Sequence, residues 1–275
     1  MAIGPFRNSQ SFALGCNRTA LAAGPGQITL TGTSQINCLL EDLIVSSDTG
    51  DFGEVTGITV AGQQILASNA NFPVGGLNAN AQTEGYRSIS LTVSQNQQVT
   101  VNVAHTNAAA LAGNYQFSIA TTPIAESQVV PTSASGSALS YLFGLGTVAV
   151  PAGGVVTATA TATALRPCIL GRMIAVELGA AGAGGTLQNI ILESLTINNI
   201  EMLTGPPAQA PGAPVVGGSV PGEWLGPLCT DVSGLQVAYP VELNSTVSAV
   251  WRNTSAAIIN VCSGFFLLPN IEAAG

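Results

Sequence analysis

Two stretches of sequence decide the fold: Cys38-Leu-Leu-Glu-Asp-Leu-Ile-Val45 and, 130 residues later, Cys168-Ile-Leu-Gly-Arg-Met-Ile-Ala175. Each begins with a cysteine, and apolar residues match at five of the positions that follow it. Short runs rich in Leu, Ile and Val are typical of buried β-strands. The match therefore predicts two copies of one β unit in the chain.

Further matches occur in the same order around both stretches. A Thr-rich alternating segment precedes each stretch; a strand with a polar turn, a strand with an Ala-rich turn and an aromatic strand follow it. The matched pairs are residues 28–31 and 156–159, 58–66 and 195–203, 101–111 and 247–257, and 115–119 and 264–268. This alignment places His105 opposite Trp251. Two copies are too few for a solenoid, so we expect them to pack side by side.

The chain as a whole has the pattern of an all-β protein. Many short β-branched runs with period-two alternation are separated by its 32 glycines and 15 prolines, which favours sandwiches or barrels. We predict two tandem jelly-roll-like β-sandwiches that arose by internal duplication. The predicted parts are an N-terminal arm (1–16), a first sandwich (17–122), a connection (123–146) with a short helix at 137–143, a second sandwich (147–269) with a Pro/Gly-rich insertion (204–222), and a C-terminal tail (270–275).

The apolar strand of each copy supplies the predicted core. Leu40 and Ile44 occupy the same positions in the first copy as Leu170 and Ile174 in the second. We expect all four side chains to be buried at matched positions of the two sandwiches.

Charge is scarce along the chain. Only 7% of the 275 residues are charged, the formal net charge is -8, and all six basic residues are arginines. A protein that binds nucleic acid through many phosphate contacts needs far more positive charge, so specific nucleic-acid binding is not expected. An uncharged surface promotes association, and it suits a protein whose surface becomes buried in subunit contacts.

The cysteines and the N-terminal sequence indicate a site of synthesis. No Cys-x-x-Cys spacing occurs among the five cysteines, which argues against a zinc or thioredoxin-like site. Cys38, Cys168 and Cys262 lie in apolar surroundings, as expected of buried free thiols in a reducing compartment. The first residues show no basic start with an apolar run, and no long apolar window follows. We therefore expect synthesis in the cytoplasm.

Catalytic chemistry has little support in the sequence. The single histidine, His105, has no nearby nucleophile or carboxylate partner in the chain, so packing is its expected role. No Gly-x-Ser-x-Gly, phosphate loop or His-Glu-x-x-His motif occurs. We expect the protein not to be an enzyme and to have no catalytic or cofactor-binding residues.

One loop contains the residue types of a calcium site. Asp48, Asp51 and Glu54 place three carboxylates within seven residues that also contain glycines. Calcium prefers six to eight oxygen ligands from such loops. The spacing differs from that of an EF-hand, and a hydrated turn is the alternative interpretation.

Two segments are candidates for contacts outside the sandwiches. The N-terminal arm, which contains Arg7, is expected to dock on an adjacent subunit or on whatever lies under the assembled subunits. The Pro/Gly-rich insertion favours an extended chain that is either exposed or lies on a neighbour. Trp224 follows it and is a candidate anchor, although core packing is the commoner role of a tryptophan.

The order of elements in the two copies resembles a viral jelly roll. In each copy a Thr-rich strand is followed by an apolar strand, a Gly turn and a strand that ends in Gly-Gln-Gln-Ile-Leu66 or Asn-Asn-Ile-Glu-Met-Leu203. In tandem it resembles the double jelly-roll major capsid proteins of tailless icosahedral bacteriophages. The resemblance implies a homotrimer that tiles an icosahedral shell in the virion, with other virion proteins as partners and an internal membrane as a further contact. The absence of lysine departs from that family, which leaves open a minor cement, spike or vertex protein. A surface β-sandwich that binds carbohydrate or a protein partner is the other class.

Overall fold

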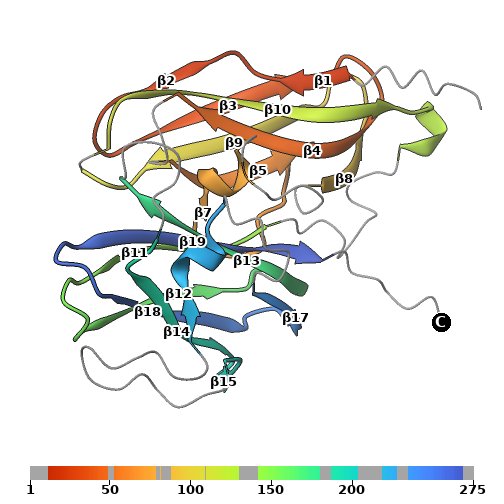
Figure 1. Ribbon diagram of the computed structural model, residues 1–275. Helices are drawn as coiled ribbons and strands as arrows, with labels where there is room; N and C mark the ends of the chain where they lie inside the picture. Colours follow the sequence, from red (N-terminus) through yellow and green to blue (C-terminus); the bar gives the residue numbers. More distant parts are fainter. Residues whose placement is uncertain are drawn as a thin grey trace, which may run out of the picture.

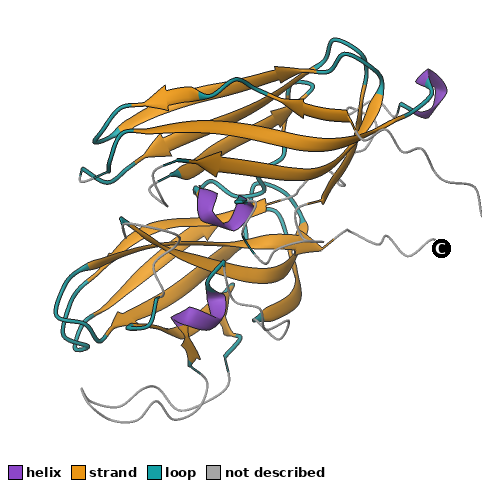
Figure 2. Ribbon diagram, turned by 45° about the horizontal axis from the view of Figure 1, so that its top comes forward, coloured by secondary structure: helices purple, strands orange, loops and turns teal. Residues whose placement is uncertain are grey.

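The computed structural model describes residues 12–48, 53–78, 81, 88–108, 110–129, 142–179, 187–203, 219–227 and 235–268. Within these residues the regular structure consists of β-strands and three short 3-10 helices (Figures 1 and 2). None of these helices has the length and apolarity that crossing a membrane requires. The strands form two sandwiches that follow one another along the chain, with the first above the second in Figure 1.

The first sandwich consists of one sheet in the order β1-β10-β4-β8, with β2 also paired to β10, and one in the order β3-β9-β5-β6, with β7 also paired to β5. These strands are β1 (Phe12–Gly15), β2 (Thr19–Leu21), β3 (Gly26–Thr33), β4 (Cys38–Ser47), β5 (Glu54–Val60), β6 (Gln63–Gln64), β7 (Phe72–Pro73), β8 (Ser88–Val93), β9 (Gln98–His105) and β10 (Gly113–Pro123). The 3-10 helices η1 (Val74–Leu77) and η2 (Glu126–Gln128) follow β7 and β10.

The second sandwich repeats this arrangement. Its sheets have the orders β11-β19-β13-β17 and β12-β18-β14-β15, with β16 also paired to β14. The strands are β11 (Leu142–Val150), β12 (Thr157–Thr163), β13 (Cys168–Leu178), β14 (Ile190–Ile197), β15 (Ile200–Glu201), β16 (Val220–Pro221), β17 (Gln236–Val241), β18 (Thr246–Asn253) and β19 (Ile259–Leu268), and η3 (Gly222–Leu225) follows β16.

Strand order identifies the fold of both halves. In each half the first strand pairs with the last, β1 with β10 and β11 with β19, and an inner pair follows the same rule, β3 with β9 and β12 with β18. Rolling one long antiparallel hairpin into two packed sheets gives this order, which is that of a jelly roll. The chain is a tandem jelly roll. The predicted fold class is confirmed.

One hairpin shows the duplication at the level of single hydrogen bonds. The side chain of Gln64 accepts the backbone N–H groups of Ile58 (2.8 Å) and Ile65 (3.1 Å). Glu201 does the same in the second sandwich, where it accepts the N–H groups of Leu195 (3.1 Å) and Leu203 (3.0 Å). Both hairpins turn through two residues with positive φ, as a type I′ turn requires. A shared clamp of this kind supports descent from one unit.

The registers of several matched strands differ from the sequence alignment: Ile28 is the counterpart of Ala158, and Tyr115 is that of Val261. Strands β9 and β18 have the same burial pattern when Gln98 is aligned with Thr246. Trp251 is then the counterpart of Val103, so its predicted match to His105 is wrong by two residues. Side chains alternate with period two along a strand, and a slip of two therefore preserves every inward and outward position. The apolar pattern alone cannot detect such a slip.

Two boundaries also differ from the predicted ones. Strand β1 pairs with β10, so its residues within the predicted arm belong to the first sandwich. Strand β11 starts at Leu142, within the predicted connection and the predicted short helix, and pairs with β19. Both segments contain glycine and lack a long alternating pattern, and the hydrogen bonds that order them come from strands distant in sequence.

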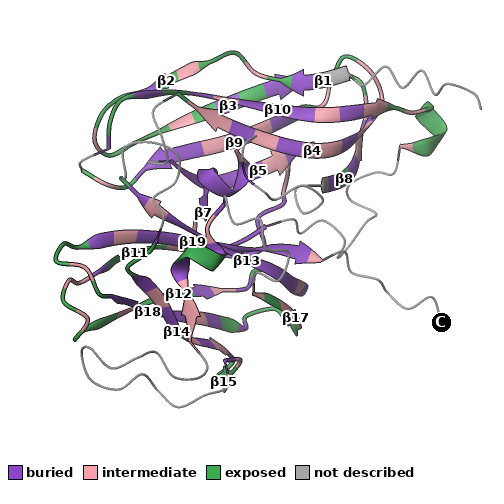
Figure 3. Cartoon of the chain, in the orientation of Figure 1, coloured by how far each residue is buried: buried purple, intermediate pink, exposed green. Residues whose placement is uncertain are grey.

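The core positions show one exception. Leu40, Leu170 and Ile174 are at most 1% exposed, as predicted, whereas Ile44 is only partly buried. The prediction for Ile44 is therefore wrong. Figure 3 shows buried strand segments continuing from the first sandwich through β7 into β19 and β13. Ile174 lies on the face of its sheet that the first sandwich covers, and the matching face that carries Ile44 lacks such a cover within the described chain.

Candidate assembly surfaces

The contact between the two sandwiches joins two different surfaces. Strand β7 and helix η1 of the first sandwich pack on the outer face of the β11-β19-β13 part of the second, between the sandwiches in Figure 2. Phe72 meets Phe266 edge to face, with ring centroids 5.3 Å apart. A Cβ on Gly76 would lie 2.8 Å from Cδ1 of Ile174. A side chain at this position would have to push the end of the Ile174 side chain aside.

Backbone hydrogen bonds fix the same contact. Residues 67–71, which lead into β7, run beside the second sandwich: the N–H of Ala67 donates to the carbonyl of Leu142 (2.7 Å), and the N–H of Leu165 donates to the carbonyl of Ala67 (2.7 Å). Ser68 donates its hydroxyl to the carbonyl of Gly144 (2.7 Å). These hydrogen bonds pair buried backbone groups of this segment with partners in the second sandwich.

Glu54, one of the calcium candidates, supports this contact from the first sandwich. Its carboxylate is 1% exposed and accepts hydrogen bonds from Thr106 and from the side chain of Asn71 (2.7 Å). The carbonyl of Asn71 in turn accepts the N–H of Gly146 in the second sandwich (2.9 Å). The buried carboxylate thus orients the residue that links the two sandwiches.

The other calcium candidates divide between a described and an undescribed position. Asp48 is exposed and accepts the backbone N–H of Asn114 (2.7 Å) and its side-chain amide (2.8 Å), and these hydrogen bonds keep the pKa of Asp48 below its ordinary value. Asp51 lies outside the described residues. The described residues contain no cluster of three metal-ligating side chains. The calcium hypothesis stays a prediction, and melting with and without millimolar Ca²⁺ tests it.

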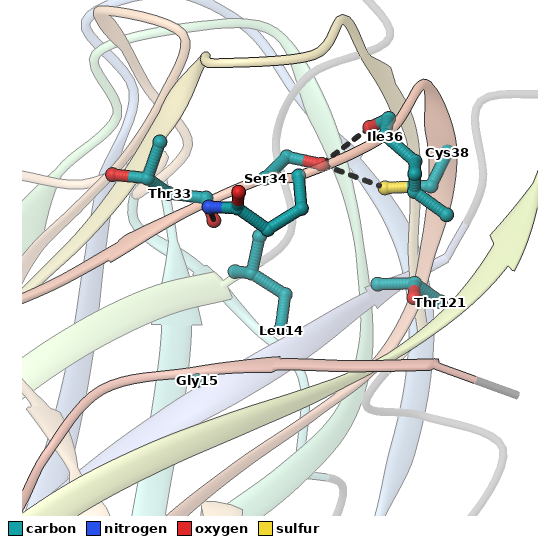
Figure 4. Close-up of a pocket in the computed structure, with 8 residues that line it drawn as sticks. Leu14, Gly15, Thr33, Ser34, Ile36, Cys38 and Thr121 are labelled. Atoms are coloured by element: carbon teal, nitrogen blue, oxygen red, sulfur yellow. Dashed lines mark hydrogen bonds between the residues drawn. The ribbon is translucent and has the colours of Figure 1, made fainter.

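A pocket of about 360 Å³ opens at one end of the first sandwich. Figure 4 shows Leu14 from β1, the turn that carries Ser34, and Cys38 at the start of β4 around it. Its lining residues are Leu14, Gly15, Thr33, Ser34, Gln35, Ile36, Cys38 and Thr121. Ser34 donates its hydroxyl to the carbonyl of Ile36 (2.5 Å) and lies 3.4 Å from the sulfur of Cys38. The pocket is uncharged and suits an uncharged chain segment.

The cysteines have the environment of packing residues. Cys38, Cys168 and Cys262 are buried free thiols, as predicted. Burial raises the pKa of all three, that of Cys168 to about 12. A thiol with a raised pKa holds its proton at neutral pH and is a poor nucleophile. The thiol of Cys38 therefore gives the pocket an apolar wall.

His105 belongs to a buried polar pair. Its Nε2 lies 2.7 Å from the hydroxyl of Tyr115, and this contact joins β9 of one sheet to β10 of the other. Burial lowers the pKa of His105 below its ordinary value, while backbone groups of Ala22 and Gly24 and the charge of Glu54 act in the opposite direction. The folded protein thus favours the neutral imidazole, which agrees with the structural role predicted for this residue.

This pair predicts a pH dependence of stability. Unfolded His105 titrates near its ordinary pKa of about 6.5, whereas the folded form has a lower pKa, so the unfolded state binds more protons between these values. Stability is full above pH about 6.5 and falls as the pH drops below it. We expect His105→Gln to flatten the dependence of the urea midpoint on pH between about 7.5 and 5. Equal slopes for the two proteins would contradict this assignment.

Trp224 is the largest exposed apolar side chain of the second sandwich. It lies on η3 with 53% of its surface exposed, so the commoner core role does not apply. The sequence offers Trp224 as a candidate anchor beside the commoner core role, but it gives no sign of the pocket, because no local motif marks a gap between β1, β10 and the turn before β4. The internal duplication is the signal that could have found both.

Comparison with known proteins adds little to this description. No protein-family model and no curated protein matches the sequence. Among solved structures, a chain of the "PBCV-1 virus capsid, quasi-atomic model" aligns with 96% of this chain and 95% of its own at 13% identity, with a TM-score of 0.34. A similarity this low supports no functional assignment. The jelly-roll assignment rests on strand order.

Proposed function

We propose that this chain is a virion structural protein, a capsid subunit that assembles with copies of itself through large uncharged contacts. The observation that carries the proposal is the asymmetry of the inner contact. It joins the β7–η1 edge of one jelly roll to the outer sheet face of the other. Since each jelly roll has both kinds of surface, the chain retains one edge and one face outside this contact. Joining unlike surfaces builds rings or open chains of subunits.

The composition supports assembly. Only 7% of the residues are charged, so two such surfaces can meet with little desolvation of charge. Obligate subunit contacts are commonly large and apolar. The edge of the second jelly roll formed by β16 and η3 carries the exposed Trp224. Tryptophan is enriched among the interface residues that contribute most to binding energy.

The resemblance to double jelly-roll major capsid proteins of tailless bacteriophages refines the proposal. By analogy with that family, the assembly unit is a homotrimer whose jelly rolls form a pseudo-hexagonal ring, and these rings tile an icosahedral shell. Its partners are then other copies, further virion proteins and an internal membrane, and its location is the virion. This analogy rests on the pattern of strands and turns.

Size-exclusion chromatography with light scattering, followed by negative-stain microscopy, tests the proposal. We expect the purified chain to elute as oligomers whose population grows with concentration, and to form rings or shells on the grid. A chain that stays monomeric from micromolar to millimolar concentration would contradict the proposal. Affinity of that monomer for sugars would favour a binding module instead.

A further inference from the structure

The free edge of the second jelly roll has a covered counterpart in the first. Strand β16 pairs with β14 as β7 pairs with β5, and η3 follows β16 as η1 follows β7. This alignment makes Trp224 the counterpart of Gly76. Gly76 is buried against the second jelly roll, whereas Trp224 is 53% exposed. The same structural edge is thus used once within the chain and left open once.

The free face of the first jelly roll also has a covered counterpart. Pairing registers align β4 with β13 and β10 with β19, so Ile44 corresponds to Ile174 and Ala120 to Phe266. Ile174 and Phe266 are buried under η1 and β7, and they belong to the core of the first jelly roll. Ile44 and Ala120 are partly exposed. The face that carries Ile44 and Ala120 can therefore accept an edge that resembles β7–η1.

The pocket beside this face also has a covered counterpart in the second jelly roll. Pairing to β10 and β19 makes Gly15 the counterpart of Gly144, and Thr33 that of Thr163. In the second jelly roll these positions are occupied: the backbone of residues 70 and 71 lies over Gly144, and Asn69 bonds to the backbone of Thr163 on both sides. In the first jelly roll the equivalent space is the open pocket of about 360 Å³. The pocket therefore lies at positions that residues 69–71 cover in the second jelly roll and that nothing covers within the described part of the first.

We propose that this pocket and the face around Ile44 bind the β16–η3 edge of a second copy of this chain. Trp224 of one copy then lies over Ile44 of the next, and Ser219, which leads into β16 as Asn71 leads into β7, lies at the pocket. This inference rests on the proposed self-assembly and specifies its contact.

Side-chain sizes on the two surfaces are complementary. Within the chain, a large Phe72 meets Phe266, and a small Gly76 lies against Ile174. At the free surfaces, Val220 replaces Phe72 and Trp224 replaces Gly76, so the large side chain lies on η3 and not on the strand. On the face that would receive this edge, the small Ala120 replaces Phe266. Ala120 leaves room for the indole where Phe266 fills the space inside the chain. The contact between copies would thus contain one large and two small side chains, where the contact within the chain contains two large and one small. This difference in shape would favour the second copy over the chain's own first jelly roll.

Two substitutions test the contact from its two sides. Trp224→Ala removes the anchor, and Thr33→Trp fills the pocket from an exposed position on β3. We expect each to weaken self-association at least about 30-fold, as loss of a central aromatic anchor does. The matched controls are Ile258→Ala, which removes another exposed apolar side chain elsewhere in the second jelly roll, and Thr31→Trp, on the same strand outside the pocket. Both controls should associate like the unaltered chain.

A disulfide trap makes the test independent of affinity. Ile44→Cys with Trp224→Cys should give intermolecular cross-links under mild oxidation, seen as a ladder on a non-reducing gel, because the equivalent pair Ile174 and Gly76 is in contact. Ile44→Cys with Ile258→Cys should give none. Suppose that the unaltered chain assembles, that chains with Trp224→Ala or Thr33→Trp associate equally well, and that no ladder forms. The proposed contact is then wrong, while the proposed function stands. A chain that never assembles overturns both.

Discussion

Ile174→Asp is expected to destabilise the folded chain by about 3–5 kcal/mol, the cost of leaving a buried charge without a partner. Ile174 is 1% exposed, under η1 of the first jelly roll, and the surrounding side chains are apolar. Such a carboxylate must either remain desolvated or take up a proton. A shift of the urea midpoint and a loss of soluble protein would report it.

Ile44→Asp is the matched control. Ile44 occupies the same position in the first jelly roll but is partly exposed, so its carboxylate can keep water. We expect this variant to unfold within about 1 kcal/mol of the unaltered chain. It should nevertheless fail to assemble, because the charge lies at the centre of the proposed contact. Equal destabilisation by the two substitutions would show that the two sheet faces do not differ in the way described.

Gly144→Ala is expected to have the second largest effect. A Cβ at this position would lie 2.2 Å from the carbonyl oxygen of Asn71 and 2.3 Å from that of Ala70. These are backbone atoms, so residues 67–71 must move away and give up hydrogen bonds such as that from Ser68 to Gly144. Overpacking and lost hydrogen bonds together should cost at least about 2 kcal/mol.

Urea unfolding and limited proteolysis measure this effect. The altered chain should be cleaved faster within residues 65–72, since the inner contact no longer holds them. Gly15→Ala is the matched control at the equivalent position, where the nearest atom to the added Cβ is a single carbonyl oxygen at 2.9 Å. It should destabilise the chain less. A neutral Gly144→Ala would mean that the inner contact does not depend on close backbone approach.

Much of the fold could be predicted because alternation and turn residues are local signals. The Thr-rich β3 and β12 and the apolar β4 and β13 each carry their periodicity within one strand. The register of β9 against β18 could not be predicted, since a slip of two residues leaves the pattern unchanged. Hydrogen bonds to β5 and β14 fix it instead.

The surfaces for assembly depend on information that no strand carries alone. Ile44 and Ile174 follow the same apolar pattern, and only the position of the neighbouring jelly roll makes one partly exposed and the other buried. The acidic loop shows the same dependence: Asp48 and Glu54 are close in sequence, yet the first bonds to Asn114 on β10 and the second to Asn71 beside the inner contact. Tertiary contacts assign these partners.

The central claim is that the contact inside the chain is repeated between chains. A cryo-electron microscopy reconstruction of the assembled protein tests it most directly, because it shows both contacts in one map. We predict that the rotation from the first to the second jelly roll of one copy recurs between the second jelly roll and the first of its neighbour, with Trp224 over Ile44. A map in which copies meet through like surfaces, with Trp224 still exposed, would contradict the claim.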